Sequence, residues 1–304
     1  KEENLLSRYH PTSVLVTGFD IIFFWVARMI MMTTHFINEV PFKKILIHGL
    51  IKDAEGQKMS KSKGNTLDPL DIIDGVNLDT LIDKRTQGLM QPKMKERIIK
   101  QTKREFPEGI KPYGTDALRL TFCSLASGGR DINFDIKRVE GYRNFCNKLW
   151  NAARFINLNI ENFGVSNVRS ETTIDAWIDY KFDETLKKVN KSIDDFRFDL
   201  ATKAIYEFIW YEFCDWFIEL HKINLNNKNY NNADVVRSMV YILEKTLRMA
   251  HPIMPFITEE IWQQLRPHLQ SSEESIMICT YPAESENRSK TDYETIEWLK
   301  IIVS

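Results

Sequence analysis

Cysteine is scarce in this chain, and the cysteines that occur are far apart: Cys123, Cys146, Cys214 and Cys279. No Cys-x-x-Cys pair is present, so the spacing typical of zinc knuckles and of disulfide frameworks is missing. Isolated cysteines fit a reducing compartment, and we expect a cytoplasmic protein.

Long apolar runs are missing too. The apolar stretch at residues 21–32 is too short to span a bilayer, and it contains Arg28. The N-terminal residues lack the layout of a signal peptide. We therefore expect a soluble protein with no membrane partner.

The chain also lacks a strong net charge, because its 41 Lys and Arg residues nearly balance its 42 Asp and Glu residues. Any contact with nucleic acid must then come from local patches. The clearest patch is residues 84–111, with nine basic residues against three acidic ones. Residues 93–104 within it have the pattern of a basic helix. Such a helix either contacts a polyanion or is a solvated face, and the sequence leaves both open.

Two common nucleotide-binding patterns are absent. Gly-x-x-x-x-Gly-Lys-[Ser/Thr] and Gly-x-Gly-x-x-Gly do not occur, which argues against P-loop and dehydrogenase functions. No repeat of solenoid period is visible either. With 304 residues, of which 43% are hydrophobic, the chain can build two moderate cores, and we expect two domains.

The most informative feature that is present is the lysine loop, residues 56–64, which carries three lysines and two serines between two glycines. Lysine supplies a compact, flexible positive charge, serine supplies small hydroxyl donors, and the glycines allow the backbone to move. Triphosphate chemistry needs this combination to stabilise a departing pyrophosphate. We interpret the loop as a mobile phosphate clamp, with a solvated surface loop as the alternative.

The N-terminal part has an alternating strand and helix pattern. A β-branched run at 14–16 precedes an apolar helix at 19–32, a second strand signal covers 44–50, and a further helix begins at 68–69. This order predicts a parallel sheet. Ligands of such sheets bind beyond the carboxyl ends of the strands, so we expect 17–20, 48–49 and the lysine loop to converge on one crevice.

Beyond about residue 135 the pattern is helical. Apolar residues between 201 and 220 recur at spacings of three and four, which indicates one helix face. Further helices are predicted near 138–158, 175–196, 233–250 and 255–268, with an asparagine-rich loop at 224–232. We therefore predict an α/β domain at 1–135 and an all-α helical bundle at 136–304. Both ends have the character of a cut chain, so we expect a fragment.

Four motifs identify a family. Lys58 to Ser62 spell KMSKS, which resembles the signature loop of class I aminoacyl-tRNA synthetases. TGFDIIFFW at 17–25, RNFCNKLWN at 143–151 and AHPIMPFITEEIW at 250–262 resemble the valyl members of that family. The resemblance runs from about residue 12 to residue 300. It implies the second half of a Rossmann-like nucleotide-binding domain, followed by an anticodon-binding bundle truncated at its C-terminal end.

The resemblance also implies site residues. Lys58, Ser60 and Lys61 would act on the departing pyrophosphate, with Lys61 as the first choice for direct ATP contact and Lys63 as a weaker candidate. The other implied ATP-binding residues are Gly18, Asp20, His48, Gly49 and Ser62. Asp20 and Ile21 would border the amino-acid pocket. From the residues alone, Asp20 could instead be a helix cap, and His48 could be hydrogen-bonded into the domain edge.

The implied reaction is activation of L-valine by ATP to valyl-adenylate, followed by transfer to tRNA(Val), by an enzyme that is monomeric. Mg²⁺ would accompany ATP, but no acidic pair here has the spacing of a metal site in the protein. Lys137, Arg138 and Arg143 are candidate tRNA contacts.

The family's His-Ile-Gly-His signature is absent, and so is its editing domain. We therefore expect the 304-residue chain alone to be inactive. A non-catalytic tRNA-binding module related to synthetases is the main alternative, and a small-molecule ligase or nucleotidyltransferase is a weaker one.

Overall fold

A computed structural model describes residues 2–89, 91–129, 131–269, 272–284 and 290–303. The chain divides into two compact units. The first unit comprises Lys1–Asp68, Asn77–Gly109 and Leu125–Asp135, and the second comprises Pro69–Val76, Ile110–Ser124 and Ile136–Ser304. The chain passes from the first unit to the second after residue 135, and two earlier segments also belong to the second unit.

The first unit opens with a short helix, α1 (Glu2–Tyr9), and then the predicted strand, helix and strand. Strands β1 (Thr12–Gly18) and β2 (Phe42–His48) are parallel, and Gly18 pairs with His48 at their carboxyl ends. Between them a 3-10 turn (Phe19–Ile21) and a π-helical turn (Ile22–Val26) lead into α2 (Ala27–Ile37). The parallel arrangement is confirmed, although β2 ends two residues earlier than predicted.

The apolar helix is longer than predicted, so the argument from length against a membrane span was wrong. Phe19–Ile37 has 19 residues, only 6% of its 18-residue apolar window is buried, and by length and composition alone it could cross a bilayer. A helix that packs into a larger core meets the same criterion. Phe23 is 84% exposed and Phe36 is 73% exposed, which leaves a large apolar face uncovered.

The rest of the first unit carries the lysine loop and a helical hairpin. Strand β3 (Ile51–Lys52) pairs in parallel with β4 (Ile132–Asn133). Asp131 fastens this pair, because its carboxylate accepts the Leu50 N–H at 2.9 Å and the Lys52 ammonium at 2.7 Å. The hairpin consists of α4 (Leu78–Thr86), a 3-10 turn (Pro92–Met94) and α5 (Lys95–Glu105). The predicted basic helix is confirmed, whereas α4 was not predicted.

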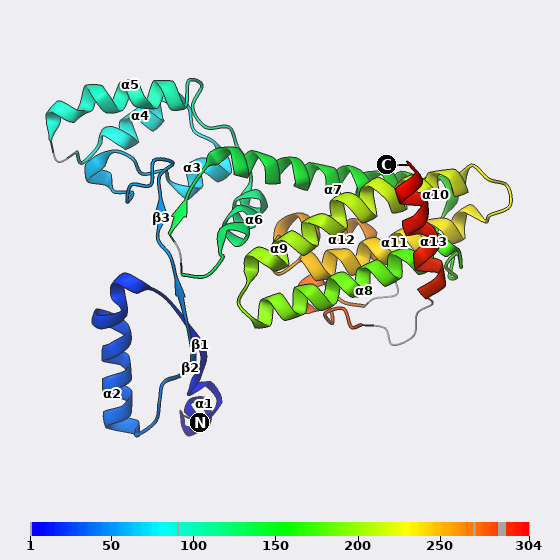
Figure 1. The fold of residues 1–304 in the computed structure, drawn as a ribbon, viewed down its shortest axis with the longest axis horizontal. Coiled ribbons are helices and arrows are strands. Elements are labelled where there is room, and N and C mark those ends of the chain that lie inside the picture. Colours follow the sequence, from blue (N-terminus) through cyan, green and yellow to red (C-terminus); the bar gives the residue numbers. More distant parts are fainter. Residues whose placement is uncertain (1, 90, 130, 270–271, 285–289, 304) are drawn as a thin grey trace. The chain divides into compact units, whose positions relative to one another are not determined.

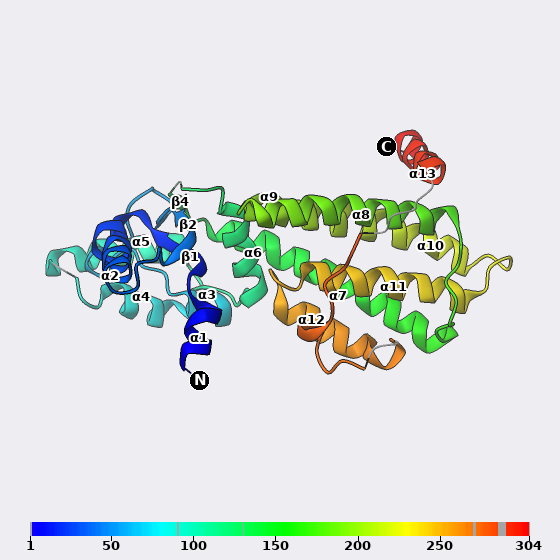
Figure 2. The same cartoon turned by 90° about the horizontal axis from the view of Figure 1, so that it is seen from below.

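The second unit is a helical bundle, as predicted (Figures 1 and 2). Its α-helices are α3 (Pro69–Asp74), α6 (Thr115–Leu125), α7 (Ile136–Phe163), α8 (Thr173–Asp194), α9 (Phe198–Glu207), α10 (Ile218–Leu225), α11 (Asn232–Ala250), α12 (Pro255–Leu265) and α13 (Lys290–Val303). A π-helical segment (Phe208–Phe217) joins α9 to α10, and 3-10 turns lie at Arg266–His268 and Ile276–Ile278. The inward faces of helices α6 to α13 and of the π-helical segment form one continuous apolar core that includes Phe145, Trp177 and Trp262.

Helix α6 fixes the start of α12 within this bundle. The Asp116 carboxylate accepts the N–H groups of Phe256 (3.3 Å) and Ile257 (2.7 Å), which lie in the first turn of α12. The Arg119 guanidinium donates to the carbonyl oxygen of Ile253 at 2.9 Å. Free N–H groups at a helix start need such acceptors, so the 250–262 motif is explained by packing and capping.

The cysteines are free thiols in this structure. Burial raises the pKa of Cys146 to about 12 and that of Cys214 to about 12. Neither thiol ionises at neutral pH, so neither is an activated nucleophile.

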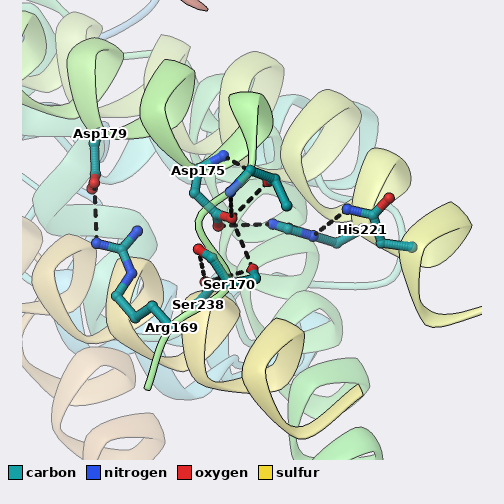
Figure 3. A network of polar contacts seen from close by, with 8 residues as sticks. Arg169, Ser170, Asp175, Asp179, His221 and Ser238 are labelled. Atoms are coloured by element: carbon teal, nitrogen blue, oxygen red, sulfur yellow. Dashed lines mark hydrogen bonds and ion pairs between the residues drawn. The ribbon is translucent and has the colours of Figure 1, made fainter. Parts of the chain in front are cut away.

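A buried polar network ties α8 to α10 and α11 (Figure 3). The Asp175 carboxylate accepts the Ser170 hydroxyl at 2.8 Å and lies 3.2 Å from His221 Nε2. The Ser170 and Ser238 hydroxyls are 2.9 Å apart. Although Ser, His and Asp meet here, the serine bonds the aspartate rather than the histidine, and His221 is completely buried. The geometry is therefore that of a structural link and not of a nucleophilic triad.

Asp175→Asn is expected to lower the free energy of unfolding by about 2 kcal/mol at pH 7, because charge-assisted hydrogen bonds are lost inside the bundle. Burial alone would raise the pKa of Asp175, but hydrogen bonds from His221, Thr172 and Ser170 outweigh it and hold the pKa below its usual value. The carboxylate therefore stabilises the fold above about pH 4, and this contribution is lost as the pH falls further. Urea unfolding should show the gap between wild type and variant closing below about pH 4.

Asp194→Asn, at the exposed end of α8, is the matched control and should change stability by less than about 0.5 kcal/mol. A pH-independent gap for Asp175→Asn would contradict the role of the carboxylate.

Candidate functional site

The lysine loop begins at a tight turn after β3. Asp53 accepts the Gly56 N–H at its carbonyl oxygen (3.0 Å) and the Gln57 N–H at Oδ1 (2.6 Å). Its own N–H donates to the Gln57 carbonyl oxygen at 2.9 Å. The two sides of the turn are thus held together by three hydrogen bonds, and the loop leaves from a fixed base.

Asn65 organises the loop from its other end, a role that the sequence did not reveal. Its Oδ1 accepts the Ser60 N–H at 2.9 Å, and its Nδ2 donates to Asp53 Oδ2 at 2.8 Å and to the Lys58 carbonyl oxygen at 3.3 Å. One amide side chain therefore satisfies polar groups at three points of the loop. The only sequence signal was its place directly after Gly64.

The side chains predicted to bind phosphate point to solvent. Lys58, Lys61 and Lys63 are exposed, and no hydrogen bond or ion pair joins their ammonium groups to the described part of the chain. Ser60 and Ser62 are half-buried, with their hydroxyl oxygens 3.1 Å apart. Three cations without an internal counter-ion, beside two hydroxyls, form a surface that is ready for a polyphosphate.

Gly64 and Arg85 attach the loop to the α4–α5 hairpin. Gly64 has a φ of +67°, and a Cβ atom there would lie 2.7 Å from the Arg85 carbonyl oxygen. Arg85, only 5% exposed, donates from Nε to the Gly64 carbonyl oxygen at 2.9 Å and from Nη1 to Glu105 Oε2 at 3.0 Å. Arg85 thus fixes the position at which the loop ends. It was not predicted either, because a single arginine in a basic segment gives no distinct pattern.

The carboxyl ends of β1 and β2 bring together the second group of predicted residues. A Cβ atom on Gly18 would lie 2.7 Å from Asp20 Oδ1 and 3.7 Å from His48 Cε1, so these three residues lie close together at this edge. The side chain of Asp20 is exposed and caps no helix, since Gly18 holds the N-cap position of the 3-10 turn. The helix-cap interpretation of Asp20 is therefore wrong. His48 Nδ1 lies 2.9 Å from the Gly49 carbonyl oxygen, and Ile21 is 39% exposed.

Convergence of these two groups stays a prediction. No hydrogen bond or ion pair between described residues joins Asp20 or His48 to the lysine loop. Among the residues that the structure describes, no cluster of three His, Cys, Asp or Glu side chains could hold a metal ion.

The candidate tRNA contacts lie on α7 in the second unit. Lys137 and Arg138 are exposed, and Arg143 is half-buried. Arg138 lines an open cavity of about 550 Å³ with three tyrosines, Tyr142, Tyr206 and Tyr211. Basic and aromatic side chains of this kind suit nucleic acid, although packing also explains the tyrosines.

Comparison with known protein families finds two matches. Residues 1–135 match the family "tRNA synthetases class I (I, L, M and V)", and residues 175–304 match "Anticodon-binding domain of tRNA ligase".

Similar proteins agree with these matches. The chain is 51% identical to a valine–tRNA ligase of Acinetobacter baylyi, over 99% of the chain and 32% of that protein. It is 50% identical to a valine–tRNA ligase of Francisella tularensis, over 98% of the chain and 33% of that protein. The chain thus spans about a third of the length of these curated relatives.

Solved structures support the fold at lower identity. A LeuRS–tRNA–LeuAMS complex from Agrobacterium radiobacter has a TM-score of 0.62 at 16% identity, covering 92% of this chain and 29% of that one. A Mycobacterium tuberculosis methionyl-tRNA synthetase in complex with methionyl-adenylate has a TM-score of 0.60 at 20% identity, covering 84% of this chain and 45% of that one. Because these matches and the relatives all agree, this chain carries a domain of the class I tRNA synthetases of the I, L, M and V group, followed by an anticodon-binding domain of a tRNA ligase.

Proposed function

We propose that this chain supplies the second half of the nucleotide-binding domain and the anticodon-binding domain of a valine–tRNA ligase. The single observation that carries the proposal is the lysine loop. Its three ammonium groups have no internal partner among described residues, and it occurs in a chain about half identical to valine–tRNA ligases. The substrates would be ATP with Mg²⁺, L-valine and tRNA(Val).

The lysine loop would act on the triphosphate. When the valine carboxylate attacks the α-phosphate, negative charge builds on the departing pyrophosphate, and Lys61 and Lys58 would stabilise it. The Ser60 and Ser62 hydroxyls would donate hydrogen bonds to phosphate oxygens. Because the loop is anchored at Asp53, Asn65 and Gly64, these donors would be pre-positioned between fixed ends.

The ends of β1 and β2 would hold the other substrate groups. The exposed Asp20 carboxylate would accept hydrogen bonds from ribose hydroxyls or from the valine ammonium group, while Ile21 would border a small apolar pocket. His48 and Gly49 would lie along the nucleotide. A cytoplasmic location and a monomeric state remain part of the proposal.

Valine-dependent exchange of pyrophosphate into ATP tests this function. The full-length protein should catalyse exchange with valine and aminoacylate tRNA(Val). If it binds tRNA(Val) but shows neither reaction, the proposal fails, and a non-catalytic tRNA-binding module explains the chain.

The isolated 304-residue chain is expected to show no useful exchange, because it contains no His-Ile-Gly-His sequence to act from the other side of the triphosphate. The same assay on the purified chain, with the full-length protein as reference, measures this. Robust exchange by the chain alone would show that the lysine loop suffices.

A further inference from the structure

Helix α5 and the turn before it present a row of cations that the proposed chemistry does not use. Lys93, Arg97, Lys100 and Arg104 recur at spacings of four, three and four, so they lie on one face, and all four are exposed. They line an open groove of about 710 Å³, which is also lined by Glu55, Glu96 and Gln101. Two of these residues, Arg97 and Lys100, lie in the middle of the helix.

These cations have no internal counter-ions. In the described part of the chain, no hydrogen bond or ion pair holds any of the four side chains, although Glu96 precedes Lys100 by four residues. The acceptors on the inner side of the helix are already used, because Glu105 binds both Arg85 and Gln101. Like charges one helix turn apart repel each other, so an external anion would relieve this repulsion.

We propose that the α5 groove binds the phosphate backbone of an RNA, and this inference rests on the proposed function, which supplies an RNA substrate. A row of charges repeating at each helix turn of about 5.4 Å suits an extended polyanion better than a single small anion. Among the described residues that line the groove, none has an aromatic or aliphatic side chain, so the groove would hold phosphates without reading bases. The same lack of apolar anchors beside the cations argues against a lipid surface.

The α5 groove lies beside the lysine loop. Glu55 in its wall belongs to the turn from which the lysine loop begins, and the hairpin that carries α5 holds the loop's end through Arg85. An RNA bound in the groove would therefore lie beside both anchors of the lysine loop.

The test compares two sets of exposed substitutions in the full-length protein. The groove variant carries Arg97→Gln, Lys100→Gln and Arg104→Gln, and the control carries Lys95→Gln and Lys103→Gln, which remove cations of α5 outside the groove. Filter binding of transcribed tRNA(Val) over a series of KCl concentrations gives the dissociation constant and its salt dependence.

The groove variant should bind about tenfold or more weakly, and its slope of log K against log salt should fall by about two to three. In the control, the loss of affinity and the change in slope should each be less than about a third of those in the groove variant. Equal losses of RNA affinity in the groove variant and the control, or no loss in the groove variant, would overturn the proposal. The proposal would also be overturned if the groove variant lost binding to phosphatidylserine vesicles while its RNA binding stayed unchanged.

Pyrophosphate exchange without RNA separates this inference from the proposed function. It should be unchanged in the groove variant. If wild type shows no valine-dependent exchange but the groove variant still loses RNA affinity, the proposed function fails, whereas RNA binding by the groove is still supported.

Discussion

Lys61→Ala in the full-length protein should lower the rate of valine-dependent pyrophosphate exchange by about 10²- to 10³-fold, while the KM for valine changes by less than about threefold. Lys61 begins the 3-10 turn of the lysine loop and is exposed, and its ammonium group has no partner among described residues. Its charge is therefore available to the pyrophosphate, and is needed most when negative charge develops there. An interaction that strengthens only in the transition state affects the rate and not valine binding.

Lys63→Ala is the matched control for this prediction. Lys63 ends the same 3-10 turn and is also exposed, but the resemblance gives it the weaker role. Its loss should cost less than about tenfold in rate. Equal losses of rate and of valine affinity in Lys61→Ala would count against a transition-state role.

Gly64→Ala should impair the same reaction by distorting the lysine loop. The residue has a φ of +67°, and the new Cβ would meet the Arg85 carbonyl oxygen at 2.7 Å and side-chain atoms of Ile98 and Leu89 at 3.1 Å. Ile98 is buried, so its side chain has little room to move. The backbone conformation alone costs about 1 kcal/mol for alanine, and the collision adds about 1–3 kcal/mol. The loop would have to leave its anchor, and exchange should fall by at least about tenfold.

Gly88→Ala separates the collision from the backbone cost. Gly88 has a φ of +75°, but a Cβ there would meet nothing within 4 Å. This variant should therefore lose about 1 kcal/mol of stability and keep nearly full exchange activity. Thermal unfolding and pyrophosphate exchange, measured on both variants, show whether the effect of Gly64→Ala comes from the collision or from the backbone conformation. If the two behaved alike, the contact between Gly64 and Arg85 would have no part in positioning the loop.

Sequence reasoning predicted which residues would bind phosphate, but it missed the residues that hold their loop in place. Lys58 to Ser62 stand next to one another, so their order was visible. Asn65 and Arg85 reach residues 12 and 21 positions away, Asp53 and Gly64, and no local pattern reports such pairings. The spacing of Leu81 and Arg85 on α4 was a possible signal, because both face inward one turn apart.

The helical bundle was predictable for a different reason. Its helices alternate apolar and polar faces over several turns, and the stripe between 201 and 220 marked one of them. Periodicity did not reveal that Phe208–Phe217 is π-helical, because a wider turn shifts side chains only gradually from the expected face. Helix α4 was missed because its short, charged sequence shows little apolar periodicity.

The way the α4–α5 hairpin joins the chain suggests how it can be gained or lost over evolution. Val76 and Ile110 exchange two backbone hydrogen bonds of 2.8 Å each. The two ends of the segment that carries the hairpin therefore lie next to each other. Segments whose ends already meet can be exchanged as modules with little disturbance to the host fold. A homologue without this module would keep the junction intact, but it would need a different partner to cover the end of its lysine loop.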